Sequence, residues 1–453
     1  MNALSQYLKL YEDYREAICA HSPSLLNDLR QQAFEYLSTA RLPEKGDEKC
    51  PAVSVNDMFA PDYGVNINRV EFPVDTASTF RCGVPNVSTL MAIVSNDTFC
   101  PTSGLLRNLP DGVLMMSLAK AAAEMPELVG RYLDTLVRPG DTAARLNTLL
   151  LQDGVFVHIS KGVVLEKPLQ VVNIFNAVAP VMGVRRMLIV VDDDASATML
   201  VCDHAERHDV KYLSDQVVEM FVGRNASLEF YDLEESSEQC SRLSTFYARQ
   251  DEGSRLTVNG STLMGGVTRN EYVVDVDGDN ADTRLAGMAM GADTQLVDNV
   301  TDLRHHSMNS SSNQIFKYVL DGQSVGSFYG TIVVDEDAKF TNSSQTNRNI
   351  LASADARMYT RPQLEIYCDD VKCSHGATVG QLDAAALFYM RSRGIPLDQA
   401  RMMLMQAFMQ DVVDTVTLPA LKTRLQQLIE HRLSGRRTLC ASASAQPCNE
   451  DGE

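Results

Sequence analysis

Short turn sequences recur through the middle of the chain at a nearly constant interval. Each has a small residue beside Asp, Asn, Glu or Gly, and those small residues are Ala195, Ala226, Ser254, Ala281 and Ala338. Successive positions are separated by 31, 28 and 27 residues and then by 57, which is about two further periods. Stacked coils of a repeat fold bury one another's apolar faces, so they keep a common length without a common sequence. The spacing therefore predicts a β-solenoid, with a β-sandwich of similar turn spacing as the alternative.

The segment between residues 154 and 363 has the composition of strands. Its apolar runs are short, rich in Val, Ile and aromatic residues, and lack helical periodicity. These runs are Val155–Ile159, Leu169–Ile174, Met187–Val191, Ser227–Tyr231 and Gly330–Val334. Together with the turn spacing, they predict a fold that is mostly β in its core.

Both ends of the chain have helical patterns. Apolar residues spaced by three and four from Leu4 onward predict a first helix, and Ser22 with Pro23 predicts the capped start of a second. Near the other end, Asp383 is expected to cap a helix that stops at Gly394. Two further helices are predicted over Leu397–Val416 and Leu418–Leu433.

The chain is long enough for more than one domain. We predict a mainly helical N-terminal domain over residues 1–150, a β-solenoid core over 151–380, a helical domain over 381–435 and a disordered tail over 436–453. The tail is expected to be disordered because its polar residues bury too little apolar area to offset the entropy of ordering.

Charge and cysteine content narrow the class of protein. A formal net charge of -19 disfavours binding to nucleic acid. Ten cysteines scattered through 453 residues favour reduced thiols, and with no visible export signal or membrane-spanning run they favour a cytoplasmic location. No phosphate-binding loop or dinucleotide-binding turn occurs in the sequence, so ATP hydrolysis by this chain is not expected.

Cys373, Ser374 and His375 place a thiol and an imidazole two positions apart. In an extended strand this spacing turns both side chains to one face, and both groups are suitable ligands for iron. From the tripeptide alone, however, an inert cysteine and a surface histidine at a strand end are the better explanation. Cys368, five positions earlier, is expected on the opposite face as a core thiol.

Two more groups of metal-ligating residues are weaker candidates. Cys202, His204 and His208 match no standard zinc spacing, and their acidic neighbours suggest a solvated loop. His305 and His306 fit a strand end or a subunit contact. Neither group is expected to bind metal.

Two carboxylate runs, residues 192–194 and 335–337, allow a different class of function. They could supply the acid and base of a β-helix enzyme that cleaves polysaccharide. Turn chemistry explains them more simply, because each run leads into one of the recurring small turn residues. The chain also has no Trp on which a sugar could stack.

The C-terminal helices carry side chains suited to a partner surface. The second of them is richer in Met than a core stripe needs, which suits an adaptable interface, although a core role is slightly favoured. The candidate contact residues are Phe388, Tyr389, Arg391, Arg393, Met402 and Met405.

Three stretches carry a specific resemblance. They are Gln345–Leu351, Arg361–Tyr367 and Asp369–Asp383, within a likeness that runs from about residue 105 to 434. On these residues the chain resembles the SufB/SufD family of iron–sulfur cluster assembly proteins. It is more similar to the SufD branch, because the SufB branch lacks the run Asp-Asp-Val-Lys-Cys-Ser-His-Gly-Ala.

The resemblance implies an architecture and partners. The architecture is a right-handed parallel β-helix flanked by N- and C-terminal helical domains. The implied partners are a SufB-like subunit that pairs through the β-helix and a SufC-like ABC-type ATPase that binds residues 384–434. Pairing of two copies is a further expectation for the isolated chain.

The resemblance also implies roles for individual residues. His375, and with it Cys373, would contact a transient iron or a nascent iron–sulfur cluster shared with SufB, and no stably bound cofactor is expected. The chain would then be a non-enzymatic scaffold or accessory subunit. The rivals are the polysaccharide-active enzyme and a purely structural assembly module without metal chemistry.

Overall fold

The computed structural model describes residues 2–70 and 89–434 of the chain. These residues fall into two compact units, one made of residues 2–70 and 89–381 and the other of residues 382–434. The first unit holds the β-structure and the N-terminal helices, and the second consists of the C-terminal helices.

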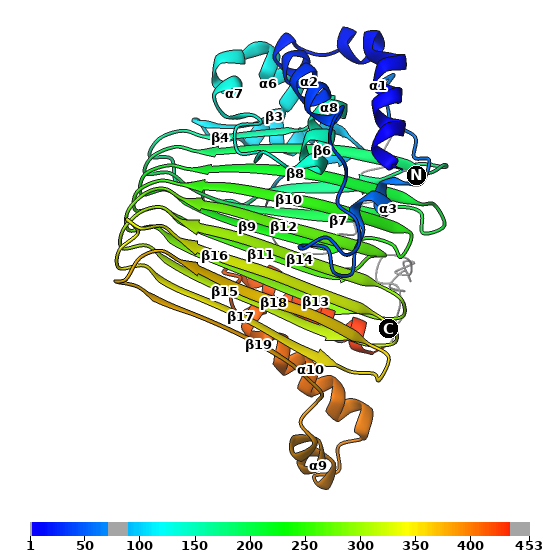
Figure 1. Cartoon of the computed structure of the whole chain (residues 1–453), viewed down its shortest axis with the longest axis vertical. Helices are drawn as coiled ribbons and strands as arrows, with labels where there is room; N and C mark the ends of the chain where they lie inside the picture. The colour runs from blue at the N-terminus through cyan, green and yellow to red at the C-terminus, as the bar shows by residue number, and fades with distance from the viewer. Residues whose placement is uncertain (1, 71–88, 435–453) are drawn as a thin grey trace, which may run out of the picture. The chain divides into compact units, whose positions relative to one another are not determined.

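The first unit is built around a parallel β-solenoid, which confirms the predicted fold class (Figure 1). Strands alternate along the chain between two sheets, which we call sheet I (β19 through the odd strands to β5) and sheet II (β18 through the even strands to β4). The strands are β4 (Val155–Ile159), β5 (Leu169–Phe175), β6 (Val181–Val191), β7 (Ser196–Ala205), β8 (Tyr212–Val222), β9 (Ser227–Glu235), β10 (Cys240–Gln250), β11 (Arg255–Met264), β12 (Val267–Val276), β13 (Asp282–Gly291), β14 (Leu296–His305), β15 (Ser311–Leu320), β16 (Val325–Val334), β17 (Asn342–Leu351), β18 (Arg357–Ile366) and β19 (Lys372–Gly380).

The recurring small residues occupy one column of turns, each between a strand of sheet II and the next strand of sheet I. All five predicted positions are buried. The structure also fills the interval of 57 residues, because Ser310 is buried at the equivalent turn between β14 and β15. Asn309 before it has a positive φ of 56°, like Asn225 and Asn280 in other turns of the column. Asn tolerates this left-handed conformation better than most residues do, which accounts for its recurrence.

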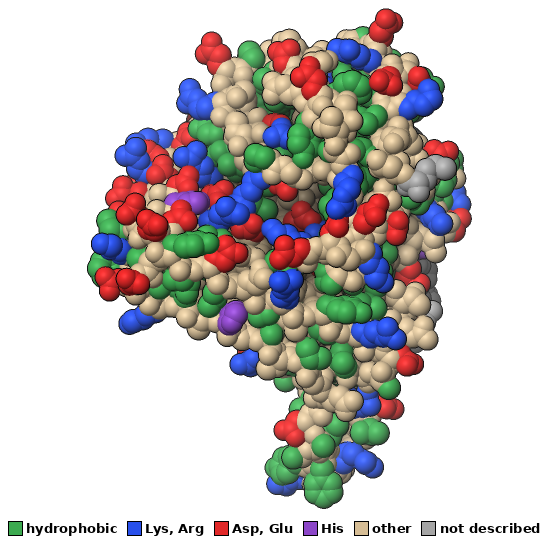
Figure 2. Space-filling model, viewed as in Figure 1, with side chains coloured by type: hydrophobic (Ala, Val, Ile, Leu, Met, Phe, Trp, Pro, Cys, Tyr) green, Lys and Arg blue, Asp and Glu red, His purple; other side chains and the backbone are tan. Residues whose placement is uncertain are grey.

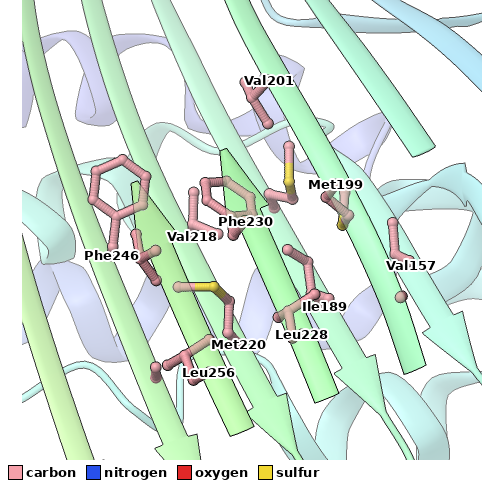
Figure 3. Close-up of a cluster of buried hydrophobic side chains, with 14 of the residues drawn as sticks. Val157, Ile189, Met199, Val201, Val218, Met220, Leu228, Phe230, Phe246 and Leu256 are labelled. Atoms are coloured by element: carbon pink, nitrogen blue, oxygen red, sulfur yellow. The ribbon is translucent and has the colours of Figure 1, made fainter. Parts of the chain in front are cut away.

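The lumen between the two sheets holds the main hydrophobic core. Figure 3 shows apolar side chains of both sheets meeting there, among them Val157, Met199 and Leu228. A row of aromatic rings continues along the lumen, with ring centroids 5.0 to 5.8 Å apart. The rings belong to Phe230, Phe246, Tyr272, Phe316 and Phe328. The lumen side chains of each coil are therefore buried by stacking on the neighbouring coils.

The two ends of the solenoid differ. At one end, β1 (Leu90–Ser95) extends sheet I, β2 (Thr98–Pro101) pairs with it antiparallel, and β3 (Val113–Ser117) pairs antiparallel with β4. At the other end, β18 and β19 are the last strands of their sheets among the described residues. The polar backbone groups of their outer edges have no further strand of the described chain to pair with.

Helices of the N-terminal region cover the outer face of sheet II. They are α1 (Ala3–Ala20), α2 (Ser24–Leu37), α3 (Val55–Phe59), α6 (Leu118–Glu124), α7 (Pro126–Tyr132) and α8 (Thr142–Leu150). A further helix, α5 (Ser103–Asn108), packs instead against β1 of sheet I. Leu4 of α1 and Leu146 of α8 belong to one buried cluster with Val184 of β6 and Leu213 of β8. The helices and the solenoid therefore share a core.

The predicted cap of the second helix is wrong in detail. Pro23, and not Ser22, is the residue before the first helical residue of α2, and it makes no side-chain cap bond. The hydroxyl of Ser22 instead donates to the carbonyl of Ile18 and accepts from Arg30.

The second unit contains three helices, α9 (Ala384–Ser392), α10 (Leu397–Val413) and α11 (Pro419–Leu433). Asp383 caps α9 as predicted, because its carboxylate accepts from the backbone N–H groups of Ala385 and Ala386. Gly394 follows the helix with a positive φ of 87°, which confirms the predicted stop. The predicted disordered tail, residues 436–453, lies outside the described residues. Among the helices that are described, none combines the length and apolarity needed to cross a membrane.

Candidate functional site

Cys373 and His375 lie on β19, at the last coil of the solenoid. In the pairing of β19 with β17, Cys373 lies opposite Ser343 and His375 lies opposite Gln345. Both of these partners are buried, and Gln345 reaches across the lumen to the hydroxyl of Thr301 on β14, 3.4 Å away. Aligned residues of paired strands share a face, so Cys373 and His375 share the face that the lumen occupies in the preceding coil.

The thiol of Cys373 has apolar surroundings. It packs against a small buried cluster that contains Ile332, Val334 and Ala338. Burial raises the pKa of the Cys373 thiol, and the neighbouring Cys368 raises it further, while a hydrogen bond with the backbone of Ser343 acts in the opposite direction. The raised pKa favours the protonated thiol over the thiolate in the isolated chain, and a nearby metal or cationic group would shift this balance toward the thiolate.

Cys368 is a core thiol, as predicted, but it does not lie on the opposite face of a strand shared with Cys373. Strand β18 ends at Ile366 and β19 begins at Lys372, so a turn separates the two cysteines. Cys368 is only 8% exposed and belongs to the same apolar cluster against which Cys373 packs. The prediction of opposite faces failed because it assumed one straight strand through both residues.

His375 is exposed, and an added Cβ at the following Gly376 would meet no atom within 4 Å. Within the described residues, no group of three His, Cys, Asp or Glu side chains is arranged to hold a metal ion. An imidazole and a thiol on one strand can supply only part of a coordination sphere, since iron and zinc sites in proteins usually have four or more ligands. Any metal at this position would need ligands from outside the described chain.

Polar side chains fill the lumen behind this face, which the sequence analysis did not anticipate. The Nε2 atom of His305 lies 2.9 Å from the hydroxyl of Ser312, which lies 2.6 Å from the hydroxyl of Ser343. Burial lowers the pKa of His305 to about 4, with a contribution from His306, so its ring is neutral. A buried row of hydrogen-bonding groups therefore ends at the residue opposite Cys373.

The group of Cys202, His204 and His208 also differs from its prediction. Cys202 and His204 are buried on β7, whereas His208 is exposed in the turn that follows, and Asp203 is no part of a solvated loop. Burial alone would raise the pKa of Asp203, but Arg242 and Arg185 in the lumen hold it below its usual range. The expectation of a loop failed because the partners of Asp203 come from other strands, Arg185 from β6 and Arg242 from β10.

His305 ends β14, in agreement with the strand-end interpretation, and His306 begins the next turn. The Nδ1 atom of His306 lies 2.6 Å from Asp335, and its Nε2 atom lies 3.3 Å from Asp275. The ring therefore links the end of β12 to the turn after β16 by ion pairs.

The carboxylate runs lie in the turn column, as turn chemistry predicted. Asp194 has a positive φ of 59°, and its carboxylate accepts from the side chain of Asn225 in the next turn. Asp192 lies 2.8 Å from the ring of His158. These contacts give the acidic residues a structural role between neighbouring coils.

The candidate contact residues on the C-terminal helices divide into two groups. Phe388 is 75% exposed, and Tyr389, Arg391 and Arg393 are exposed with it on α9 or at its end. Figure 2 shows hydrophobic side chains beside basic ones over this helix. Met405, in contrast, is only 8% exposed, so in the described chain it is a packing residue, and Met402 is half-buried. A contact role for Met405 stays a prediction.

A pocket of about 430 Å³ lies away from this site, over the outer face of sheet II. Its charged groups are paired within the protein. Arg138 lies 2.7 Å from Asp275 and 2.9 Å from Asp302, and the hydroxyl of Tyr247 donates to Asp141. The pocket therefore presents little unpaired charge to a ligand.

Two family models match the chain. The one described as the SufBD core domain of the SUF system for iron–sulfur cluster assembly matches residues 174–408. The one described as the N-terminal region of SufBD proteins matches residues 1–171. The match to the core domain covers the solenoid from the last residues of β5 onward and reaches into α10.

Relatives of known assignment agree with these matches. An iron–sulfur cluster assembly SufBD family protein of Synechocystis is 29% identical over 419 residues, which cover 90% of this chain and 91% of that protein. The iron–sulfur cluster assembly protein SufD of Bacillus subtilis is 25% identical over 440 residues, or 94% of this chain and 97% of that protein. The protein of the same name from Escherichia coli is 38% identical over 176 residues, which cover 39% of this chain and 42% of that protein.

Proposed function

Because the chain belongs to the SufBD family of iron–sulfur cluster assembly proteins, we propose that it acts as a non-catalytic scaffold subunit that pairs end to end with a SufB-like subunit. The observation that carries this proposal is the asymmetry of the solenoid. At one end the terminal strands β2 and β3 run antiparallel to their neighbours and α5 packs against β1, whereas at the other end the terminal strands β18 and β19 continue the parallel stacking.

The exposed side chains of the last coil support pairing at this end. Tyr359 and Ile366 of β18 and Val379 of β19 are large, apolar and exposed, as is Tyr367 in the turn between the strands. Edge strands and apolar patches are costly to leave in water, because they invite association. A second solenoid stacked on this coil would pair the backbone groups and bury the side chains.

We place a transient iron or nascent cluster, as cargo, at His375 and Cys373 of this end. These residues supply one imidazole and one thiol, and the SufB-like partner would supply the remaining ligands. A shared site of this kind fits the incomplete ligand set of the described chain. It also fits the protonated state of the Cys373 thiol, because a metal would displace the proton only when the partner completes the site.

The C-terminal helices are proposed to bind a SufC-like ABC-type ATPase. Phe388 and Tyr389 are exposed aromatic residues next to two exposed arginines, which is the composition of interface hot spots. The described chain would then supply a docking surface, and the ATPase would supply the energy of any conformational change.

Co-expression with SufB-like and SufC-like subunits tests the proposal. The tagged chain should recover both, and a Phe388→Ala/Tyr389→Ala variant should lose the SufC-like subunit alone. Tyr14→Ala is the matched control, because Tyr14 is an exposed aromatic residue on α1. Recovery of neither subunit by the unaltered chain would overturn the proposal.

The metal site requires a separate experiment. His375→Ala should lower the iron content of the purified complex without changing its subunit composition. The control is His208→Ala, which removes an exposed histidine from a turn far from the last coil in sequence. Equal iron contents in the two variants would leave a purely structural assembly module as the function of the chain.

A further inference from the structure

Cys368 and Cys373 flank the closing turn of the solenoid, between β18 and β19. Both thiols contact one apolar cluster, whose buried members include Ile332, Val334 and Ala338. Cys368 also contributes electrostatically to the environment of the Cys373 thiol. The shared cluster therefore places these thiols in one neighbourhood.

The backbone on both sides of the turn is anchored to the preceding coil. The N–H of Tyr367 donates to the carbonyl of Val334 at 2.9 Å, and the N–H of Lys372 donates to the carbonyl of Thr341 at 2.8 Å. In the middle of the turn, the carbonyl of Asp370 accepts from the N–H of Phe340 at 2.7 Å. The residues before Cys368 and before Cys373 are thus both hydrogen-bonded to the preceding coil.

No other pair of described cysteines shares such a cluster. Cys50, Cys202 and Cys240 are buried in other parts of the first unit, and Cys19 lies on α1. In the preceding coil the residue opposite Cys373 is Ser343, so the thiol pair occurs only in the closing turn of the described solenoid. The placement of both thiols at the edge of the last coil gives small oxidants access to the half-buried Cys373.

We propose that Cys368 and Cys373 are a redox-active pair that forms an intramolecular disulfide, with Cys368 as the resolving thiol. The oxidant is a small disulfide of the glutathione class. Cys373 loses its proton and attacks one sulfur of that disulfide, which releases one glutathione and leaves a mixed disulfide. Cys368 then loses its proton and attacks the sulfur of Cys373, which releases the second glutathione. The protein gives up two hydrogens, and the oxidant becomes two thiols.

The consequence for function rests on the proposed role of Cys373 in the shared metal site. A disulfide removes the Cys373 thiol from that site and leaves His375 as the only ligand that this chain supplies. Reduction of the disulfide by a thiol restores Cys373 as a ligand. The closing turn would thereby make cluster assembly at this end responsive to the thiol–disulfide balance.

The sequence provides a direct chemical test. Trypsin cleaves after Lys372, and the bonds after Arg357 and Arg391 are the neighbouring sites, because Pro362 protects Arg361. Cys368 therefore falls in the peptide 358–372 and Cys373 in the peptide 373–391, each with one cysteine. The full chain is incubated with glutathione disulfide, its remaining thiols are alkylated, and the digest is analysed by mass spectrometry without reduction.

We expect the two peptides to appear joined, with the mass of their sum less two hydrogens, and to separate on reduction. Cys368→Ser should abolish the joined species and trap glutathione on Cys373, whereas Cys19→Ser should leave it unchanged. Two separate peptides in the oxidised unaltered chain, whether alkylated or each bound to glutathione, would overturn the proposal. This readout involves no iron, so the absence of a disulfide would not contradict the proposed metal site. Conversely, an unchanged iron content in the His375→Ala complex would not contradict the disulfide.

Discussion

The guanidinium of Arg186 lies 2.6 Å from the carboxylate of Glu219, and neither side chain is exposed to solvent. Asp134, which precedes α8, lies 2.9 Å from the same guanidinium. Arg186 and Glu219 project from the outer face of sheet II, so this buried group ties the N-terminal region to the solenoid.

Loss of Glu219 should be strongly destabilising. Glu219→Ala leaves the buried guanidinium of Arg186 with one carboxylate in place of two, and breaking a buried pair from one side costs about 3–5 kcal/mol. The measurement is the midpoint of urea unfolding, followed by far-UV circular dichroism. Lys9→Ala is the control, because the pair of Lys9 with Asp13 is exposed, and its midpoint should not change. Equal midpoints for the two variants would contradict this role.

The aromatic row of the lumen should contribute as much to the stability of the fold as the buried ion pair of Arg186 does. The ring of Phe316 lies 5.8 Å from Tyr272 and 5.0 Å from Phe328 between centroids. Phe316→Ala leaves a cavity in a fully buried row and should lower the free energy of unfolding by about 3–5 kcal/mol. Phe340→Ala removes an exposed ring in the turn before β17 and should cost much less in the same experiment.

The period of the solenoid could be predicted from sequence because turn chemistry is local. Asn and Asp at positive φ, followed by a buried small residue, leave a trace that does not depend on distant contacts. Ser310 escaped notice because it lies among other polar residues, where nothing marks it as buried. The structure supplies that missing coil.

Contacts between coils could not be predicted in the same way. Asp203 belongs to a lumen network with Arg185 and Arg242, which lie 18 and 39 positions away along the chain, and no local pattern pairs them. The lumen row from His305 to Ser343 depends likewise on register between strands. For the candidate site, the common face of Cys373 and His375 could be predicted from the spacing of the tripeptide. The position of Cys368 beside the same apolar cluster could not, because it depends on the geometry of the closing turn.

Stability should depend on the protonation of His306. Hydrogen bonds with Asp275 and with Asp335 raise the pKa of His306 to about 9, from an ordinary value of 6.5. A raised pKa in the folded state stabilises the protein fully below pH 6.5, and this contribution is lost as the pH rises through about 9. The melting temperature should therefore fall between pH 6.5 and 9 by more in the unaltered protein than in His306→Gln. Because the ring is partly exposed, the difference should be only about 1 kcal/mol; parallel curves would contradict the ion pair.

The cap of α9 should control order in the helix that carries Phe388. Asp383→Ala removes the acceptor for two backbone N–H groups and should weaken the helix by about 1 kcal/mol. Hydrogen exchange at Ala385 and Ala386 should accelerate severalfold, whereas exchange in the solenoid strands should not change. Asp383→Asn, which keeps an oxygen acceptor, should restore most of the protection.

If a partner covers the last coil, a charge placed on its exposed apolar surface should weaken the pairing. Val379 is 46% exposed on β19, and Val178, in the turn before β6, is 83% exposed at a position away from the last coil. Val379→Arg should leave the fold of the isolated chain unchanged but place an unpaired charge in the proposed interface, weakening pairing with a SufB-like subunit by at least about tenfold. Val178→Arg should pair normally. Sedimentation of each variant mixed with the purified SufB-like subunit distinguishes these outcomes, and equal affinities would mean that the partner does not stack on β19.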